Sequence, residues 1–260
     1  MTAAGAPVVV KLGGSLLEDR EARTALLSAI VRASGEAGSL LLVHGGGKRI
    51  DAALSARGIP KRTQAGLRVT DAPTLEVVVA VLHTVNRELV DEIAALGAPA
   101  SGVASPWILR AAVHPPVDGV VLGYVGRVIG VESAALGAAR AASPIAVLAP
   151  LGVGPDGRAL NVNADSAAAA IAAAAGARRL VFLTDVEGVA DAGGRRIEQL
   201  DAPSARRLLQ GSAVSGGMRP KLEACLSAAA AGVGEIVIAG PRRQREALAG
   251  GRGGTHVVAA

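Results

Sequence analysis

Two runs of aliphatic residues each end in a cluster of glycines, and each cluster is followed by a helical pattern. The first run, Val8–Leu12, leads into Gly13-Gly14 and an amphipathic helical pattern over Glu18–Ala37. The second run, Leu40–Val43, leads into His44–Gly47 and another helical pattern. Strand, glycine turn and helix in direct succession, twice over, are typical of β-α-β units. The sequence therefore predicts an α/β fold with a largely parallel sheet.

The alternation of strand and helix patterns continues to the C-terminus with one interruption. Residues 99–129 form short strand-like runs broken by glycine and proline, which favours an antiparallel excursion. No Ser- or Pro-rich linker divides the chain, and we expect two α/β lobes, residues 1–177 and 178–260, joined edge to edge. Further strand patterns lie at residues 145–149, 180–183, 236–239 and 255–258, one arm of a hairpin at 64–69, and helical patterns at 74–96, 131–141, 163–175, 203–210 and 218–231.

The distribution of charge argues against a nucleic-acid partner, and the cysteine content excludes an intrachain disulfide. The formal charge of +5 arises from 27 basic and 22 acidic residues, and the arginines are scattered along the chain. Nucleic-acid readers cluster their basic residues and interleave aromatic ones for stacking, whereas the densest basic run, Arg242–Arg245, has no aromatic residue near it. Small phosphorylated ligands account for this charge better than nucleic acid does. Cys225 is the only cysteine, so we expect an inert buried thiol and no intrachain disulfide.

Nothing in the sequence predicts a secreted or membrane-bound protein. Residues 1–7 lack the basic and apolar regions of a signal peptide. The longest apolar run, Ala167–Ala175, is too short to span a bilayer. We therefore expect a cytoplasmic protein without a membrane partner.

Several familiar binding motifs are missing from the sequence. It contains no Gly-x-x-x-x-Gly-Lys-Ser/Thr, which excludes a P-loop. Gly152–Gly157 matches Gly-x-Gly-x-x-Gly, but a strand-like run follows it instead of a helix. Asp156-Gly157 is therefore better interpreted as a hairpin turn. No His/Cys cluster has the spacing of a zinc site, and we predict no metal bound directly by the protein.

Candidate functional groups follow the two glycine turns instead. Open α/β sheets bind ligands at the carboxyl ends of their strands, and glycines there let backbone N–H groups approach a phosphate. Lys11 lies one residue before Leu12, which leads into the first turn. A glycine pair also precedes the helical pattern that contains Lys221, and the loop Thr184–Gly188 follows another strand pattern. A single glycine turn is also compatible with a tight connection between a strand and a helix. Two neighbouring glycine turns together with a lysine are a more specific signal of a phosphate-binding site.

Three polar segments have both a functional and a structural interpretation. Arg68 stands between apolar residues, where its guanidinium either grips a ligand carboxylate or forms a surface ion pair. Asn161 and Asn163 point the same way at the start of a helical pattern. Helix capping by Asn163 or Asp165 accounts for one of them but leaves Asn161 unexplained. Lys221, about one turn into its helix, is either a ligand group or a solvated side chain.

Seven motifs occur in order along the chain: Lys11-Leu-Gly-Gly, His44-Gly-Gly-Gly, Gly66-Leu-Arg-Val-Thr, Leu122-Gly-Tyr-Val-Gly, Asn161-Val-Asn-Ala-Asp, Leu183-Thr-Asp-Val-Glu-Gly and Gly217-Met-Arg-Pro-Lys. In order and spacing they resemble the amino-acid kinase family, over nearly the whole chain. The third and fifth motifs are similar in particular to members that phosphorylate N-acylated glutamate. The resemblance implies a three-layer αβα sandwich with two lobes, the first binding the acylamino acid and the second ATP.

The reaction implied by the resemblance is ATP-dependent phosphorylation of the γ-carboxylate of N-acetyl-L-glutamate, a step of arginine biosynthesis. Lys11 and Lys221 match the lysines that neutralise the phosphoryl group in flight, and Asp165 matches the aspartate that holds them. Such a transfer needs in-line positioning and charge stabilisation more than acid–base chemistry. Mg²⁺ would be carried by the ATP phosphates, with few or no direct protein ligands.

The remaining site residues are also carried over by position. The backbone donors to the phosphoryl group and the substrate match Gly14, Gly46 and Gly47, and the groups that grip the acylamino acid match Arg68, Asn161 and Asn163. The nucleotide-binding loops match Thr184, Asp185, Val186, Glu187, Gly188, Val189, Ala190, Ala213, Val214 and Ser215.

Two alternatives remain open. One is a sibling kinase that acts on N-succinylglutamate or a carrier-linked aminoadipate, which would need a roomier pocket. The other is a catalytically silent amino-acid or nucleotide sensor, against which the presence of Lys11, Asp165 and Lys221 counts. The resemblance further implies a homodimer formed through the N-terminal lobe. Arginine-sensitive relatives carry an additional N-terminal helix, so with only residues 1–7 before the first strand we expect no inhibition by free L-arginine.

One segment departs from the family pattern. A Gly-x-Asp-Gly turn typically follows the strand-like run Ala98–Val103, but this chain has Ala104-Ser105-Pro106-Trp107. We therefore expect a different local hairpin and a different shape of the pocket for the acyl group.

Overall fold

A largely parallel sheet lies at the centre of the computed structural model, which describes residues 5–103, 106–191, 193–211, 214 and 216–258. In this part of the chain the sheet has eight strands in the order β12-β14-β13-β11-β1-β2-β8-β5, and only β13 and β14 pair antiparallel. The strands are β1 (Val8–Leu12), β2 (Leu40–His44), β5 (Ala100–Val103), β8 (Ile145–Leu148), β11 (Arg179–Leu183), β12 (Gln199–Asp201), β13 (Glu235–Ala239) and β14 (Thr255–Val258).

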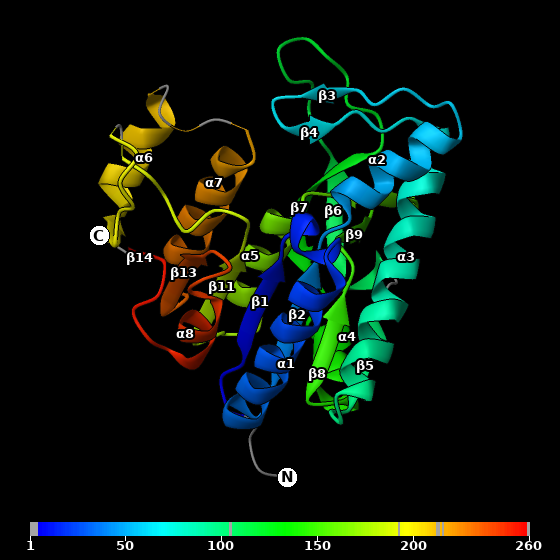
Figure 1. Cartoon of the computed structure of the whole chain (residues 1–260). Helices are drawn as coiled ribbons and strands as arrows, with labels where there is room; N and C mark the ends of the chain where they lie inside the picture. Colours follow the sequence, from blue (N-terminus) through cyan, green and yellow to red (C-terminus); the bar gives the residue numbers. More distant parts are fainter. Residues whose placement is uncertain (1–4, 104–105, 192, 212–213, 215, 259–260) are drawn as a thin grey trace.

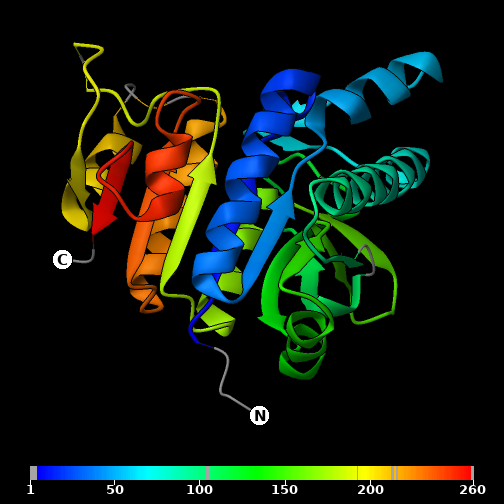
Figure 2. The same ribbon diagram turned by 60° about the horizontal axis from the view of Figure 1, so that its bottom comes forward.

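Alternate residues of each strand pack against opposite helical layers, because successive side chains of a strand point to opposite faces. On β1, Val8 and Val10 pack into one apolar cluster, with α1, α3 and α8, whereas Val9 packs into another, with α4, α5 and α7. Figures 1 and 2 show α1 and α8 on the same side of the sheet. The predicted three-layer αβα sandwich is confirmed. The helices are α1 (Arg20–Ala37), α2 (Gly47–Ala56), α3 (Ala72–Ala95), α4 (Ser133–Ala142), α5 (Ala164–Ala174), α6 (Ala202–Gln210), α7 (Met218–Ala230) and α8 (Gln244–Ala249).

Helix α5 lies against the central strands because its buried side is built from alanine. Ala167, Ala168 and Ala172 are fully buried in the cluster that also contains strand and α7 residues. Such small side chains let the helix axis approach the sheet and a neighbouring helix closely. The N-terminus of α5 is thereby held next to the carboxyl end of β1, where the first glycine turn begins.

Polar side chains cap several of the helices. The N–H of Thr74 donates to Asp71 Oδ1 (3.0 Å) at the start of α3, where Pro73 lies in the first turn. Asp19 caps α1 and Asp201 caps α6 in the same way. Helix α1 begins at Arg20, after a short 3-10 turn, and so starts slightly later than expected.

The excursion expected over residues 99–129 is only partly antiparallel. Its first strand, β5, joins the main sheet in parallel beside β8, so this part of the prediction is wrong. The reason is that α3 packs against β5, where Gly102 has no side chain to collide with Asn86. The rest contributes an antiparallel β6–β7 pair to a small closed barrel, which two later strands complete around the predicted hairpin turn at Gly157 (φ +77°). The strands of the barrel are β6 (Leu109–Val113), β7 (Val125–Val131), β9 (Leu151–Val153) and β10 (Ala159–Val162).

Residues 64–69, expected to be one arm of a hairpin, contain parts of both arms. Strands β3 (Thr63–Gln64) and β4 (Leu67–Arg68) pair antiparallel around Ala65 and Gly66. Both turn residues have positive φ, +47° and +80°, which is typical of a two-residue hairpin turn. Figure 1 shows this hairpin above the ends of β1 and β2.

Two elements escape the sequence patterns. Strand β12 is three residues long and buries only Leu200, so it carries no periodic signal. Helix α8 directly follows Arg242 and Arg243 of the basic run. Within the described ranges no helix combines the length and apolar character required to cross a membrane. Ala104 and Ser105 of the atypical segment lie outside the described residues, and the side chain of Trp107 is 62% exposed.

Candidate active site

The two glycine turns meet at one edge of the sheet. β1 pairs in parallel with both β2 and β11, and Leu12 lies opposite His44 on one side and Leu183 on the other. The segments that follow these three strands therefore leave the sheet at the same level. The N–H of Gly45 donates to the carbonyl of Leu12 (3.0 Å), and the N–H of Gly13 donates to that of Leu183 (3.0 Å).

Gly14 allows the two turns to touch. A Cβ atom at this position would lie 3.1 Å from the Gly47 nitrogen and 3.4 Å from the Gly46 nitrogen. A side chain here would stand in front of the backbone N–H groups that the sequence predicts as ligand donors. The structure thus brings Gly14, Gly46 and Gly47 together.

Lys11, Asp165 and Lys221 form a buried ion cluster. Asp165 Oδ1 accepts from Lys11 Nζ (2.9 Å) and from Lys221 Nζ (3.0 Å). The three residues are only 8%, 6% and 4% exposed, respectively. They come from β1, α5 and α7, and Lys221 Nζ also lies 5.3 Å from the ring centroid of Phe182. The alternative of a solvated Lys221 is therefore wrong.

The cluster carries one negative and two positive charges. Burial tends to raise the pKa of Asp165, but the charges of Lys11 and Lys221 outweigh it and hold this pKa below its ordinary value. Burial and the nearby Lys11 charge lower the pKa of Lys221 against the opposing effect of Asp165. Asp165 is thus ionised at neutral pH and leaves an excess positive charge, which suits an anionic ligand above the cluster.

A cavity of about 690 Å³ lies over this edge of the sheet. It is as large as many small-molecule sites in proteins. Its lining includes Lys11, both glycine turns and the β3–β4 hairpin. Predicted site residues in the lining are Lys11, Gly14, Gly46, Gly47, Arg68, Asn161, Asn163 and Asp185.

A second cavity, of about 720 Å³, lies between β7, α5 and α7. Its lining includes six alanines and three valines beside polar residues such as Asn163, Arg127 and Glu223, and it does not include Lys11. Lys11 of the ion cluster lines the first cavity and not the second, so we assign the function to the first cavity.

Arg68 lines the first cavity with an unsatisfied donor. Its Nη2 pairs with the carboxylate of Asp51 and donates to the carbonyl of Gly47 (3.3 Å). Its Nη1 is buried and has no hydrogen-bond partner in the described part of the chain. A buried unpaired donor is costly, so a ligand acceptor would stabilise this arrangement. Asp51 also accepts from Lys61 Nζ (2.8 Å).

Asn161 and Asn163 both line the cavity and have different partners. Asn163 caps α5, since its Oδ1 accepts from the backbone N–H groups of Asp165 (2.9 Å) and Ser166 (3.1 Å). Asn161 Nδ2 donates to Thr70 Oγ1 (3.1 Å). The capping interpretation therefore holds for Asn163, while Asn161 connects the barrel to the segment that follows Arg68.

The Leu122–Gly126 motif supports the same connection. The N–H of Thr70 donates to the carbonyl of Leu122 (2.9 Å), and the N–H of Tyr124 donates to the carbonyl of Thr70 (2.7 Å). Gly123 adopts a φ of +70°, and a side chain on it would collide with the Thr70 carbonyl. Only glycine fits here without strain.

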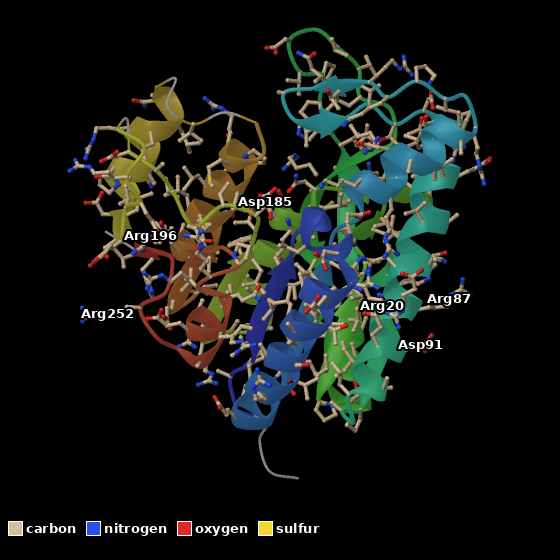
Figure 3. All side chains as sticks on the ribbon, in the orientation of Figure 1. Arg20, Arg87, Asp91, Asp185, Arg196 and Arg252 are labelled. Atoms are coloured by element: carbon tan, nitrogen blue, oxygen red, sulfur yellow. The ribbon has the colours of Figure 1, made fainter. Side chains whose placement is uncertain are left out.

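Of the predicted nucleotide-binding residues that the structure describes, Asp185 lines the cavity. Figure 3 shows Asp185 near the centre of the molecule, whereas Arg87 and Asp91 lie on its outer side. The N–H of Val189 donates to Thr255 Oγ1 (2.9 Å), which fixes the loop against β14. Ala213 and Ser215 lie outside the described residues. Of the others, Thr184, Val189 and Val214 are buried, and Val186, Glu187, Gly188 and Ala190 complete the loop outside the cavity lining.

Sequence reasoning missed several polar residues of the cavity. Lys48, Asp51 and Lys61 line it. Lys48 directly follows the glycine triplet, so its position offered a signal. Asp51 and Lys61 could not be recognised as cavity residues from the sequence, because they line the cavity only when the hairpin folds over α2. Among the described residues no group of three or more His, Cys, Asp or Glu side chains is placed to hold a metal ion. Cys225 is buried, and burial raises the pKa of its thiol, as an inert cysteine requires.

Comparison with known proteins gives concordant matches. The model of the amino acid kinase family matches residues 6–240. Acetylglutamate kinase from Koribacter versatilis is 38% identical over 242 residues, which are 93% of this chain and 92% of that protein. The structure of smu.665 from Streptococcus mutans UA159 superposes with a TM-score of 0.81 at 27% identity, covering 97% of this chain and 98% of the other.

A longer protein is also similar in structure. N-acetylglutamate synthase from Neisseria gonorrhoeae, solved with coenzyme A and N-acetylglutamate, has a TM-score of 0.85 at 26% identity, and the match covers 98% of this chain but 59% of the synthase. The family model, in contrast, matches most of this chain, and the Koribacter relative matches over most of both proteins. This chain therefore belongs to the amino acid kinase family.

Proposed function

We propose that the chain is an acetylglutamate kinase, which uses ATP to phosphorylate the γ-carboxylate of N-acetyl-L-glutamate in arginine biosynthesis. The observation that carries this proposal is the buried Lys11–Asp165–Lys221 cluster, whose Lys11 lines a cavity that two glycine turns also line. The relatives of about the same length that bear this name support the choice of substrate.

The chemistry follows from the charges of the reacting groups. An oxygen of the substrate γ-carboxylate attacks the γ-phosphorus of ATP, the bond from that phosphorus to the β,γ-bridging oxygen breaks, and ADP leaves with the bond electrons. The carboxylate is already ionised, so no general base is needed. Lys11 and Lys221 reduce the repulsion between the two anions and stabilise the charge of the transferring group. Mg²⁺ enters as the ATP complex.

Each of the two lobes binds one substrate in this proposal. Residues 1–177 bind the acylamino acid through Arg68, Asn161 and Asn163, while residues 178–260 bind ATP through the loops at 184–190 and 213–215. The buried, unpaired Nη1 of Arg68 supports the first assignment, because a substrate carboxylate would satisfy it. We further propose a cytoplasmic homodimer formed through the N-terminal lobe, which light scattering would test.

Turnover with four acceptors tests the proposed function. ATP would be offered with N-acetylglutamate, N-succinylglutamate, glutamate or aspartate, and acyl phosphate would be trapped as the hydroxamate with hydroxylamine. We expect the largest kcat/KM with N-acetylglutamate. A larger value with N-succinylglutamate would favour the sibling kinase, and no hydroxamate with any acceptor would favour the sensor.

Arg68→Lys is expected to raise KM for N-acetylglutamate by about tenfold or more and to leave KM for ATP nearly unchanged. A lysine cannot reach Asp51 and a substrate carboxylate at once with a planar fork. Arg62→Lys is the matched control, because Arg62 is exposed and pairs only with Asp71 among the described residues. Initial-rate kinetics with each substrate varied would check this. A raised KM for ATP in Arg68→Lys would contradict the division of substrates between the lobes.

The pH dependence of kcat/KM is expected to show the lowered pKa of Lys221. As pH rises, Lys221 loses its proton earlier than an ordinary lysine does, so kcat/KM for ATP should fall before the ordinary lysine range, about pH 10.4, is reached. Lys221→Arg keeps its charge at high pH and should lose this alkaline decline, although its overall rate will be lower. An identical decline in both proteins would assign it to another group.

A further inference from the structure

His44, the residue before the three glycines of the second turn, is fully buried and makes a hydrogen bond at each ring nitrogen. Nδ1 lies 3.1 Å from the carbonyl oxygen of Gly45, and Nε2 lies 3.2 Å from Nδ2 of Asn86. An amide nitrogen can only donate, so Nε2 accepts and the ring proton resides on Nδ1. His44 therefore donates to the Gly45 carbonyl.

Asn86 is itself held in place from two sides. It lies on α3, is 2% exposed, and donates its second amide hydrogen to the carbonyl of Val147 on β8 (2.9 Å). Its oxygen occupies the space beside Gly102 of β5, where any Cβ atom would collide with it. Helix α3 and strands β5 and β8 thus fix Asn86, and Asn86 fixes the tautomer of His44.

The orientation of the Gly45–Gly46 peptide links His44 to the cavity. In a trans peptide the C=O and the N–H point in opposite directions. His44 holds the Gly45 carbonyl toward the buried side, so the N–H of Gly46 points the other way, and Gly46 lines the cavity. This N–H has no acceptor within the part of the chain that the structure describes. It is a backbone donor aimed at a ligand.

We propose that His44 and Asn86 are positioning residues for phosphoryl transfer, which hold the Gly45–Gly46 peptide so that the Gly46 N–H faces the reacting carboxylate or phosphoryl group. This inference rests on the proposed kinase function. Preorganised donors stabilise a transition state because they need not reorient during the reaction. A rotated peptide would present the Gly45 carbonyl oxygen, which repels an anion.

The electrostatics of the pair agree with a neutral donor. Burial lowers the pKa of His44 to about 4, and the Gly45 carbonyl opposes this shift. No charged side chain among the described residues contributes to it. The ring therefore keeps one proton, on Nδ1, throughout the neutral range, and activity of the natural protein should not depend on His44 titration there.

Asn86→Leu tests the proposal against a matched packing variant. It removes the donor to Nε2, and we expect kcat to fall about tenfold or more with KM for ATP changed less than about twofold. Val90→Ala is the control, because Val90 lies one turn further along α3 and also adjoins Gly102 but has no polar group to donate to a ring nitrogen. Its kcat should stay within about twofold of the natural value.

Asn86→Asp gives a readout that a structural defect alone would not produce. The new carboxylate would accept from Nε2 and leave a neutral His44 with a bare Nδ1 facing the Gly45 carbonyl. Protonation of the ring restores the Nδ1 donor, so kcat of this variant should rise relative to the natural protein as pH falls from about 8 to about 6. Proton-decoupled nitrogen NMR should report Nδ1 protonation in the natural protein.

The outcomes separate the two proposals. A natural protein that forms no acyl phosphate from N-acetylglutamate overturns the proposed function and this inference with it. An active natural protein whose Asn86→Leu and Asn86→Asp variants keep kcat, or lose it without the pH trend in Asn86→Asp, overturns the positioning role alone.

Discussion

Lys221→Ala and Lys11→Ala are each expected to lower kcat for acyl phosphate formation by about 10²-fold or more. Each removes one of the two ammonium groups that share Asp165 Oδ1, at 2.9 and 3.0 Å. With one lysine gone, the positive charge of the other is neutralised by Asp165, and the excess positive charge of the cluster disappears. Hydroxamate trapping at saturating substrates measures the effect directly.

Two further variants isolate the charge from the packing. Lys221→Met keeps most of the aliphatic chain and should lose kcat as severely as Lys221→Ala. Arg219→Ala removes a cation from the first turn of the same helix, where Arg219 is exposed and paired with Glu223, and kcat should stay within about twofold. Near-normal kcat in either lysine variant would overturn the assignment of the cluster.

Asp165→Asn is expected to reduce both activity and stability. The amide keeps the shape of the carboxylate but leaves two buried ammonium groups, 8% and 4% exposed as residues, without a counter-charge. Removal of one partner of a buried ion pair typically costs about 3–5 kcal/mol of unfolding free energy. We also expect kcat to fall about 10²-fold, because the lysines lose the group that fixes their positions. Urea unfolding and initial rates on the same samples measure the two effects.

A double variant distinguishes charge repulsion from a packing defect. Adding Lys11→Met to Asp165→Asn leaves a single buried cation, so part of the lost unfolding free energy should return while kcat stays low. If the double variant is no more stable than Asp165→Asn, repulsion between Lys11 and Lys221 is not the cause of the instability. Acid titration provides a separate check. Because the folded pKa of Asp165 is depressed, its stabilising contribution is complete above the unfolded value, about 3.9, and is lost as pH falls through the folded value.

The order of elements could be predicted because most of them carry strong local signals. Glycines after Leu12 and His44 marked the ends of two buried strands, and a helical pattern over residues 74–96 marked α3. Where a signal was weak, tertiary contacts decided the structure. β5 joined the main sheet because α3 covers it, and β12 exists through its pairing with β14.

The residues of the site could be predicted from the sequence, but the contacts between them could not. Lys11, Asp165 and Lys221 are far apart in sequence, and only the fold shows that a single carboxylate oxygen receives both lysines. The partners of Arg68 and His44 could not be predicted, because Asp51 and Asn86 occupy ordinary helical positions with no local pattern to mark them. Sequence motifs identify residues that contact a ligand. The side chains that position those residues become apparent only from the packing of the folded chain.

The strand order of the main sheet also sets the sequence of events during synthesis. β1 is made before both of its neighbours, β2 and β11, between which it lies. One hydrogen-bonding edge of β1 therefore stays unpaired until β11, which ends at Leu183, has been made. Pairings of such large sequence separation form slowly, and an unpaired apolar strand promotes aggregation. Until β11 has been made, the nascent chain thus holds only half paired a strand that is buried along its whole length in the folded protein.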